Sequence, residues 1–459
     1  MKKLATMEES RFLRLFFAAI SVCFVIAAFI MPDRATMFSG MMDIWLGTCK
    51  ISTNYFALGG YAATFLNMGI VGLICTALFF LPGAKANNVS TLGVLLTIGF
   101  ASWGMNPVNM IHTILGVCLY ALVKKEKLGA VSNAMLYSTG IAPLISELLF
   151  RYPGMGEELL GFNWLGLALA LFVGLIIGFF LPAGMAHAPN IHKGYDHYSA
   201  AVPIGFTAFF LRTVLYNVML GAKIGDVSKI PGNAPAGYSM FLGCNIFAIA
   251  VFVVCIVVAL LMGCKPKDYW NLMKDSGKGV SFTTKYGNAP FLMNVGIFGL
   301  MIVGYYNLAM ALDPTNTLQA GWTGMTFGIV WCMLATCNSG SHPRNVLPIM
   351  IGYIVTSYLF GWINGQLGGS FALTIGSQSI LIGLCYANGM SPVSGQYGFG
   401  YGILAGGIHY LLVSAVPDMH GGFCLYNGGF TAALICLLLI PQLEKFCKTK
   451  EERALARQK

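Results

Sequence analysis

The sequence predicts an all-α fold: a polytopic membrane bundle of about ten transmembrane helices, arranged as a 5+5 inverted repeat with two re-entrant hairpins. Hydrophobic residues make up 57% of the chain and charged residues only 10%, whereas soluble domains carry about 25% charged residues. Apolar runs recur at about the 20 residues that a membrane-spanning helix needs. In addition, several short sequences of the first half return in the second half.

Ten candidate spans follow the apolar runs, at residues 11–31, 57–81, 129–150, 163–185, 203–221, 238–263, 288–312, 371–392, 398–417 and 424–441. The first run is too long for a signal-peptide core and no small-residue cleavage site follows it, so we expect it to be retained. Two further apolar stretches, 91–123 and 322–361, are each split by a proline-centred turn into arms of about 15 residues. Such arms are short for a hydrocarbon core of about 30 Å, which favours re-entrant hairpins.

Lysine and arginine predict the orientation, because cytoplasmic loops hold most of them. They precede the first span, flank the first hairpin, fill the central loop and crowd the C-terminal tail, whereas 313–321 and 362–370 around the second hairpin hold none. We expect a bacterial inner (plasma) membrane protein with both termini in the cytoplasm. The first hairpin then enters from the cytoplasm and the second from outside. Lys223 and Lys229, on a predicted outer loop, do not fit this pattern.

Three short motifs recur in the same order in the two halves. They are Asn67–Gly72 with Asn294–Gly299, Gly140–Pro143 with Gly389–Pro392, and Gly205–Ala208 with Gly429–Ala432. With five spans and one hairpin in each unit, the units have opposite orientations, as in transporter folds that bind solute at the repeat interface. We place the first repeat at 1–235 and the second, with the tail, at 236–459. Chance matches between glycine-rich apolar segments are the alternative.

The two proline-centred turns hold the first candidate binding residues. Asn106 and Asn109 of the first turn correspond to His342 and Asn345 of the second, where Ser341 adds a hydroxyl. Backbone freed inside hydrocarbon survives only where protein or a polar cavity satisfies it. Two tips entering from opposite faces would therefore meet at a polar solute site. The alternative is that these side chains only cap two interrupted helices.

Arg344 stands where the first turn has Val108, and it suggests the charge of the solute. An arginine near the bilayer centre costs about 2.5–3.5 kcal/mol on insertion scales, and its planar fork suits a carboxylate or another oxyanion. We therefore expect an anionic solute. A structural ion pair with Glu147, or a turn near the interface from which Arg344 reaches water, is the alternative.

Glu147 follows the break at Pro143 and corresponds to Gln396 in the second half. A desolvated carboxylate could carry a coupling proton, and Arg212 is a second candidate partner for it. Structural pairing of Glu147 with Arg212 or Arg344 is the alternative. Serine hydroxyls near the breaks bind solute or satisfy freed carbonyls. The predicted substrate-binding residues are Asn106, Asn109, Ser341, His342, Arg344, Asn345, Ser391, Ser394 and Gln396, with Glu147 and Arg212 for coupling.

The sequence contains no motif for nucleic-acid binding, metal binding or enzymatic catalysis. The net charge of +10 reports membrane orientation, and no nucleic-acid motif accompanies it. Thirteen cysteines include no Cys-x-x-Cys pair, and His187, His192 and His197 do not share one helix face. We therefore predict no disulfide framework, no metal site and no cofactor. No nucleotide-binding loop or hydrolase motif is present, so we do not expect an enzyme.

The segments Asn338–Asn345 and Leu425–Ala432 carry a resemblance that covers nearly the whole chain. With their sequences Asn-Ser-Gly-Ser-His-Pro-Arg-Asn and Leu-Tyr-Asn-Gly-Gly-Phe-Thr-Ala, the protein resembles a family of bacterial multipass membrane proteins classed as a domain of unknown function. The resemblance implies a membrane protein and brings no activity with it. In layout the chain is also similar to urea transporters and, in its opposed hairpins, to elevator-type carboxylate carriers.

Three functional hypotheses follow. The first is an ion-coupled secondary transporter for a small polar, anionic solute, with a proton or sodium as coupling ion, the lipid bilayer as surroundings and a homo-oligomer left open. The second is a facilitative channel for a small neutral solute, of the urea-transporter type, in which Arg344 is structural or repels cations. The third is a membrane scaffold or intramembrane enzyme, which needs no continuous aqueous route between the repeats.

Overall fold

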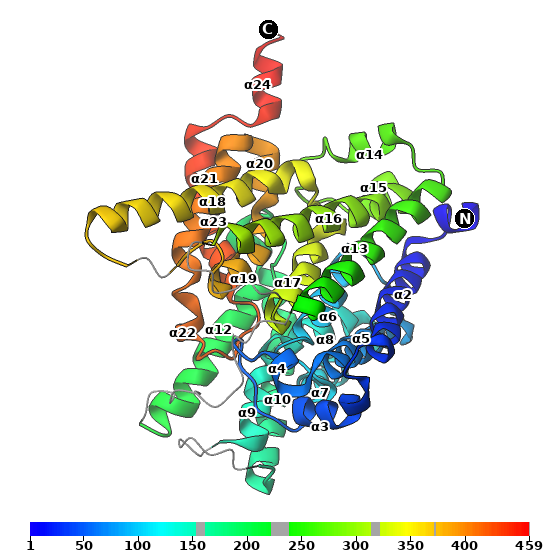
Figure 1. Cartoon of the computed structure of the whole chain (residues 1–459), viewed down its shortest axis with the longest axis vertical. Coiled ribbons are helices and arrows are strands. Elements are labelled where there is room, and N and C mark those ends of the chain that lie inside the picture. Colours follow the sequence, from blue (N-terminus) through cyan, green and yellow to red (C-terminus); the bar gives the residue numbers. More distant parts are fainter. Residues whose placement is uncertain (153–160, 222–237, 314–321, 371–372, 459) are drawn as a thin grey trace.

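The computed structural model describes residues 1–152, 161–221, 238–313, 322–370 and 373–458, and every regular element in these ranges is a helix (Figure 1). Ten of the described helical segments are long and apolar enough to cross a membrane, so this is a multipass membrane protein. These ten are Glu9–Ile30, Tyr61–Phe80, Pro107–Lys124, Leu128–Phe150, Trp164–His192, Ala201–Val218, Met240–Leu261, Asn288–Leu312, Pro343–Gln366 and Asn427–Ala456.

The helices of the two halves follow one another in a matching order of long and short elements. Those of the first half are α1 Lys2–Ala5, α2 Glu9–Ile30, η1 Arg34–Thr36, α3 Met37–Trp45, α4 Tyr55–Gly59, α5 Tyr61–Ala77, η2 Leu78–Phe80, α6 Asn88–Phe100, α7 Pro107–Lys124, η3 Leu128–Val131, α8 Ser132–Ser138, η4 Thr139–Ile141, α9 Ala142–Phe150, α10 Trp164–His187, α11 Pro189–His192, α12 Ala201–Arg212 and η5 Thr213–Val218. Those of the second half are α13 Tyr238–Leu261, α14 Pro266–Leu272, α15 Phe282–Tyr286, α16 Asn288–Leu312, α17 Gly324–Leu334, η6 Ala335–Asn338, α18 Pro343–Gln366, α19 Gln378–Ala387, η7 Asn388–Met390, α20 Ser391–Tyr397, α21 Phe399–Val413, α22 Val416–Met419, α23 Asn427–Phe446 and α24 Lys450–Ala456.

Eight of the ten predicted spans coincide with long helices, and two do not. The predicted span 371–392 is the shorter helix α19, which ends in the tight turn η7, and the predicted span 398–417 is α21, with 15 residues. Their places among the long helices are taken by α7, with 18 residues, and α18, with 24. The expectation of hairpin arms of about 15 residues is therefore wrong for these two arms. Gly361 does not end α18, because one glycine costs a helix only about 1 kcal/mol.

The two halves repeat the same helix packing. α2 lies along α5 as α13 lies along α16, and α7 lies along α10 as α18 lies along α21. The short helices α4 and α15 each end at a glycine with positive φ, Gly60 at 87° and Gly287 at 89°, from which the next long helix begins. The predicted boundary between the repeats, after residue 235, lies outside the described residues, as do Lys223 and Lys229.

One buried asparagine in each half fastens the hairpin turn. Asn67 Nδ2 donates to the carbonyl oxygens of Ala101 at 2.7 Å and Met105 at 2.9 Å, and its Oδ1 accepts from Trp45 Nε1 at 2.9 Å. Asn294 Nδ2 donates to the two equivalent carbonyls of the second turn, at 2.9 Å each. Both asparagines are fully buried and begin the repeated motif that the sequence shows. Each amide thus satisfies backbone that the turn has freed.

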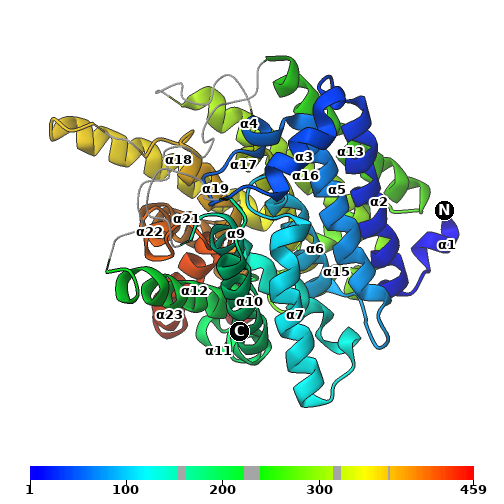
Figure 2. The ribbon, with the colours of Figure 1, turned by 90° about the horizontal axis from the view of Figure 1, so that it is seen from below.

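Helices α6 and α17 lie near the middle of the molecule (Figure 1 and Figure 2) and pack against each other in opposite directions. Ser102 Oγ, just after α6, donates to the first carbonyl of α17 at 2.7 Å, and Asn338, at the end of η6, donates to Thr91 Oγ1 in the first turn of α6 at 3.2 Å. The backbones touch, since a Cβ on Gly328 would lie 2.5 Å from the Gly99 carbonyl oxygen. This close contact requires glycine on both helices.

The two hairpin turns consequently lie at opposite ends of the α6–α17 pair. Thirteen residues of α6 separate them, which corresponds to about 20 Å along the helix. The expectation that the two tips meet at one solute site is therefore wrong. The two short helices overlap along their length instead of meeting end to end.

Replacement of Asn67 or Asn294 by alanine should destabilise the protein strongly. Each change leaves two buried carbonyls unpaired, at a cost of about 1–3 kcal/mol for each group. Thermal unfolding in detergent measures the effect. The matched control is Asn364→Ala, because Asn364 bonds only an exposed carbonyl, that of Ser370, and a loss within about 0.5 kcal/mol is expected there. Equal losses in all three variants would contradict the role given to the buried pair.

Candidate functional site

The predicted site residues separate into two clusters, one at each hairpin turn. Asn106, Asn109, Glu147 and Arg212 belong to the first turn and its neighbours, and Ser341, His342, Arg344, Asn345, Ser391, Ser394 and Gln396 to the second. The clusters are held apart by the length of the α6–α17 pair.

At the first turn, the two asparagines cap helix α7. The backbone N–H of Asn106 donates to Asn109 Oδ1 and the N–H of Asn109 donates to Asn106 Oδ1, both at 3.0 Å. Their amide nitrogens are also used: Asn106 donates to the Ile44 carbonyl at 3.0 Å and Asn109 to Ser146 Oγ at 3.0 Å. With Pro107 in the first helical position, this is a complete helix start.

Glu147 is paired with Arg151, and not with Arg212 or Arg344. Arg151 Nε lies 2.8 Å from Glu147 Oε1, which also accepts from Tyr216 OH at 3.0 Å, while the buried Oε2 finds no hydrogen-bond partner within the described ranges. The sequence reasoning missed Arg151, although a spacing of four residues on one helix places two side chains together. Arg212 is half-buried, and its Nε has no partner among the described residues.

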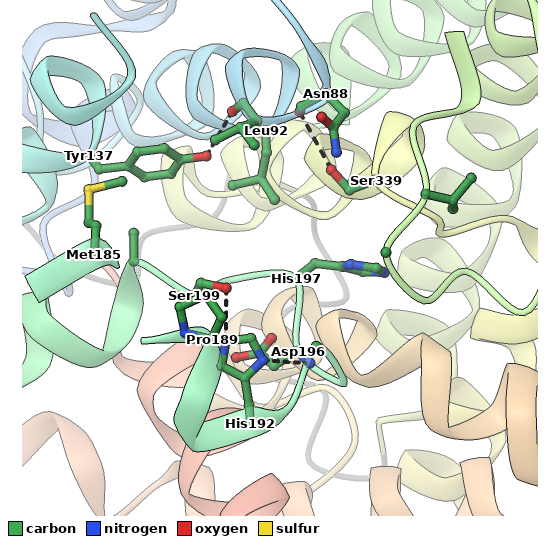
Figure 3. Close-up of a pocket in the computed structure, with 15 residues that line it drawn as sticks. Asn88, Leu92, Tyr137, Met185, Pro189, His192, Asp196, His197, Ser199 and Ser339 are labelled. Carbon is green, nitrogen blue, oxygen red and sulfur yellow. Dashed lines mark hydrogen bonds between the residues drawn. The ribbon is translucent and has the colours of Figure 1, made fainter. Parts of the chain in front are cut away.

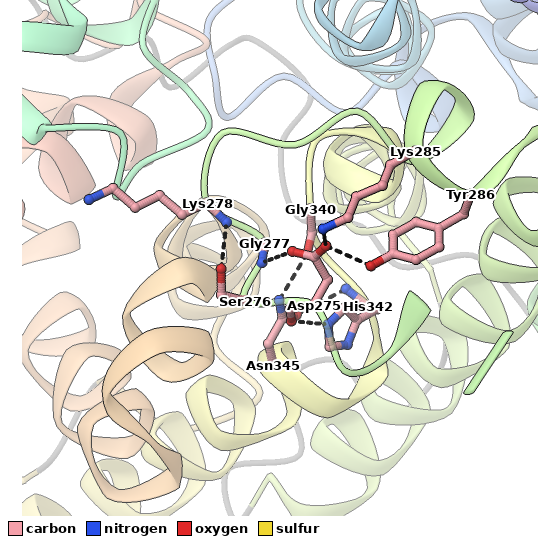
Figure 4. Close-up of polar contacts among 9 residues, drawn as sticks. All are labelled: Asp275, Ser276, Gly277, Lys278, Lys285, Tyr286, Gly340, His342 and Asn345. Atoms are coloured by element: carbon pink, nitrogen blue, oxygen red, sulfur yellow. Dashed lines mark hydrogen bonds and ion pairs between the residues drawn. The ribbon is translucent and has the colours of Figure 1, made fainter. Parts of the chain in front are cut away.

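The second turn docks on the loop between α14 and α15 (Figure 4). The N–H of His342 donates to Asn345 Oδ1 at 3.0 Å, and Asn345 Nδ2 donates to the Gly340 carbonyl at 2.9 Å. His342 Nε2 lies 3.0 Å from the Asp275 carbonyl, which can only accept, so Nε2 carries the proton. Gly340, with φ 130°, touches Gly277: a Cβ on Gly340 would lie 2.1 Å from the Gly277 oxygen.

Arg344 points away from this buried cluster. Its side chain is exposed, on the side of the molecule where Lys450 lies. Ser394 is buried and its carbonyl accepts from Lys450 Nζ at 3.1 Å. The arginine that suggested an anionic solute therefore lies at the surface, where water solvates it.

A cavity of about 320 Å³ opens beside the second turn (Figure 3). Its walls are the loop between α11 and α12, the first turn of α6, residues 279–280 and the end of η6. His192, Asp196, His197 and Ser199 lie on the side of the α11–α12 loop, and Asn88, Leu92, Tyr137 and Ser339 lie across the cavity from them. The polar lining residues are Asn88, Tyr137, His192, Asp196, His197, Ser199 and Ser339.

Asp196 is the acid of this cavity, and its carboxylate is only half satisfied. The side chain is 2% exposed; Oδ1 accepts from the Tyr198 N–H at 3.0 Å, whereas Oδ2 has no hydrogen-bond partner in the part of the chain that the structure describes. Burial raises the pKa of the Asp196 carboxyl to about 7. The sequence reasoning missed Asp196, although it stands alone as the acid of its apolar region between two histidines.

His192 has both ring nitrogens engaged. The N–H of Asp196 donates to its Nδ1 at 3.3 Å, and Ser199 Oγ lies 2.8 Å from its Nε2. Since a backbone N–H can only donate, Nδ1 holds a lone pair and the proton of the neutral ring sits on Nε2. His192 therefore donates to Ser199. Among the described residues, no three His, Cys, Asp or Glu side chains are placed to hold a metal ion.

His197 and Tyr195 connect the cavity loop to three of the predicted residues. His197 Nε2 lies 3.2 Å from Ser391 Oγ, which lies 3.0 Å from Ser341 Oγ, and Tyr195 OH donates to Gln396 Oε1 at 2.6 Å. Ser341, Ser391 and Gln396 contact the cavity loop but are not among the residues that line the cavity. They hold the loop that carries Asp196.

A second, much smaller cavity of about 60 Å³ lies in the equivalent place of the other half. Tyr137 lines the larger cavity and Tyr386 the smaller one, and each stands three residues before the repeated glycine–proline motif. In the same way, Ser339 lines the larger cavity and Trp103 the smaller one, and each directly precedes the glycine of a hairpin turn. The cavity loop of each half is hydrogen-bonded to the glycine–proline motif of the other half. The N–H of His197 donates to the Gly389 carbonyl at 3.1 Å, and that of Leu425 donates to the Gly140 carbonyl at 2.9 Å.

Four tyrosines form a layer between the two cavities. The ring centroids of Tyr198 and Tyr386 are 5.0 Å apart, and Tyr426 lies 6.3 Å from both Tyr386 and Tyr137. Tyr198 OH donates to Asn388 Oδ1 at 2.9 Å, whereas Tyr426 OH is buried without a hydrogen-bond partner. The layer of packed rings separates the cavities.

The fold defines a multipass helical membrane protein, with two cavities in equivalent places of its halves. Residues 33–220 and 264–445, more than half of the chain, match the family described as "Protein of unknown function (DUF1576)". The chain belongs to this family. No curated protein and no solved structure matches it.

Replacement of Glu147 by glutamine should destabilise the protein because it leaves the buried Arg151 cation unpaired, at a cost of about 3–5 kcal/mol. The double variant Glu147→Gln/Arg151→Gln should recover most of that loss, because no buried charge remains. Thermal unfolding of both variants tests this. If the double variant is as unstable as the single one, pairing with Arg151 is not what holds Glu147.

Asp196→Asn should remove a pH dependence of stability. In the folded protein the pKa of Asp196 is about 7, against about 4 when unfolded. The folded state therefore holds the proton more tightly, and this contribution to the free energy of unfolding is lost as pH rises from about 4 to about 7. Unfolding followed across this range should show a flatter profile for Asp196→Asn. The control Asp418→Asn changes an exposed acid and should keep the slope.

Proposed function

We propose that this protein is a secondary carrier that moves a small polar solute across the membrane by alternating access. The observation that carries the proposal is the pair of cavities in equivalent places of the two halves, one of about 320 Å³ and the other of about 60 Å³. When two like-folded halves hold different conformations, one access route is open and the other closed, and exchange of the two conformations reverses them. The tyrosine layer is then the barrier between the routes.

We further propose that the halves are inverted and that the larger cavity faces the cytoplasm. The antiparallel α6–α17 pair supports inversion, and the long arms α7 and α18 then complete hairpins that enter from opposite faces. Both chain ends reach the same face as the loop beside the larger cavity: Asn288 Nδ2 donates to the Leu4 carbonyl at 3.0 Å, Glu9 accepts from Thr284, and Lys450 lies near Arg344. This lysine-rich face is the cytoplasmic one under the positive-inside bias.

A carrier accounts for the interior better than a channel does. A channel for a small neutral solute needs a continuous polar path, whereas packed tyrosine rings lie between the cavities. The predicted anionic solute depended on Arg344, which is exposed and does not line the larger cavity. We therefore propose a polar solute that enters the larger cavity and meets Asp196 there.

The Ser199–His192 pair favours binding over hydrolysis. An activated serine needs a histidine nitrogen with a free lone pair to take its proton. His192 Nε2, the nitrogen that faces Ser199 Oγ at 2.8 Å, carries the ring proton because Nδ1 accepts from the backbone. The Asp196 carboxylate does not bond this ring. The pair is thus a donor–acceptor contact that fixes the cavity wall, in keeping with a carrier and not an enzyme.

Coupled labelling of two engineered cysteines tests the carrier. Val280 lines the larger cavity and Leu425 the smaller one. In sealed vesicles, Val280→Cys should react with an impermeant maleimide from the face of the chain ends, and Leu425→Cys only slowly, from the other face. In the double variant, prior modification at position 280 should hold the larger cavity open. We expect at least tenfold slower labelling at position 425, which corresponds to about 1.4 kcal/mol.

The parent protein supplies the background for this experiment, because it has thirteen cysteines, ten of them buried. Modification of Leu455→Cys, on the exposed α24, is the matched control and should leave the labelling of position 425 unchanged. If the labelling rate at position 425 does not change when position 280 is modified, alternating access is ruled out. Faster urea-driven swelling of vesicles containing the protein than of empty vesicles would favour the channel.

A further inference from the structure

We propose that Asp196 Oδ2 is the point at which a proton and a cationic group of the solute compete, so that the carrier exchanges a small organic ammonium or guanidinium compound for a proton. This inference depends on the proposed function for its transport step. It names the class of solute and the coupling group, which are separate questions from whether the two cavities alternate.

The first argument is the unfinished coordination of the carboxylate. Asp196 is only 2% exposed. Oδ1 accepts from the Tyr198 N–H, whereas no described residue offers Oδ2 a hydrogen bond. A buried carboxylate oxygen without a partner is costly unless it binds a proton or a cation. The residue lines the cavity and is labelled in Figure 3 next to His192. A ligand in the cavity can therefore supply the missing partner.

The second argument is the charge of the cavity. Among the described residues that line it, Asp196 is the one acid and none is a lysine or an arginine. The groups that face Asp196 from the surrounding elements are His192, Tyr198 and Cys436. Burial of the His197 ring lowers its pKa to about 3, so it stays neutral near pH 7. With Asp196 ionised the cavity carries a negative charge, which repels a carboxylate and attracts a cation.

Lys193 and Lys278, which adjoin the lining residues Gly194 and Gly279 in the sequence, contact groups outside the cavity. Lys278 Nζ lies 3.7 Å from the Tyr195 ring centroid, and Lys193 Nζ is paired with Glu444 at 2.5 Å. Neither side chain lines the cavity. The Tyr137 ring and the Met185 side chain do line it, and an aromatic face favours an ammonium or guanidinium group. A volume of about 320 Å³ limits the guest to a small molecule.

The exchange is balanced in atoms and charge. In the solute-free state the Asp196 carboxyl holds a proton on Oδ2; its pKa of about 7 means that the proton leaves readily near neutral pH. When the cation arrives, the O–H bond breaks, the proton passes to water in the cavity, and the carboxylate forms an ion pair with the solute. Release of the cation on the other side is followed by uptake of a proton there. One positive charge crosses in each direction.

Thermal unfolding of the purified protein with three probes tests the site. The probes are guanidinium, tetramethylammonium and, as the anionic match, acetate. A ligand of the folded state raises the melting temperature, so at least one of the two cations should do so at millimolar concentration. The shift should be larger at pH about 8.5 than at pH about 6, because less proton competes for the carboxylate. Acetate should give no shift. Asp196→Asn should abolish the cation effect, and Asp418→Asn should retain it.

A second measurement does not depend on folding of the variant. In weakly buffered solution at pH about 7, binding of the active cation to the wild-type protein should release a fraction of one proton for each cation bound. Stabilisation by acetate, an equal cation effect in Asp196→Asn, or no proton release would overturn the inference, as would the absence of any shift with both cations.

The outcomes separate this inference from the proposed function. If neither cation binds but labelling at positions 280 and 425 remains coupled, the carrier stands and the cation–proton exchange falls. If a cation binds at Asp196 but the labelling is uncoupled, the cavity is a binding site and the carrier falls.

Discussion

The interior of this protein depends on satisfying the backbone that two hairpin turns free inside an apolar bundle. Asn67 and Asn294 do this with matching pairs of hydrogen bonds to the turn carbonyls. Because these amides fix the turns, the short arms α6 and α17 can lie against each other through the contact of Gly99 with Gly328. The central pair in turn sets the distance between the turns and the position of the cavity walls. Polar side chains collect at its two ends, where the turns leave the helical pattern.

The two halves share this frame but differ in the chemistry they hold. Near the first turn, Glu147 and Arg151 form a buried ion pair to which Tyr216 OH donates a hydrogen bond, and we assign this pair a structural role. Near the second turn, the loop with Asp196 faces an open cavity and keeps one carboxylate oxygen unpaired. The equivalent loop of the other half closes its cavity almost completely. The two halves therefore share their helix packing and differ in the loops that line their cavities.

Much of the frame could be predicted from residues that are close in sequence. The repeated motif that begins at Asn67 and Asn294, and the proline turns that begin helices α7 and α18, are visible without coordinates because caps and turns are local. The predicted site was less accurate. Asn106 and Asn109 use their amide oxygens to cap α7. Arg344 is exposed at the surface, because neighbouring residues of a helix face different sides.

Hydropathy, turn chemistry and motif order are properties of short stretches, so they suffice to predict an all-helical membrane protein with two like halves and two interrupted apolar segments. Long-range packing was needed to show that the turns lie apart, that Glu147 binds Arg151, and that Asp196 is buried in a cavity. Burial and partner choice depend on which distant segments come together: the wall around Asp196 joins the α11–α12 loop, α6 and residues 279–280. No local pattern encodes that meeting, since the same acid in a loop would be solvated if those elements packed elsewhere.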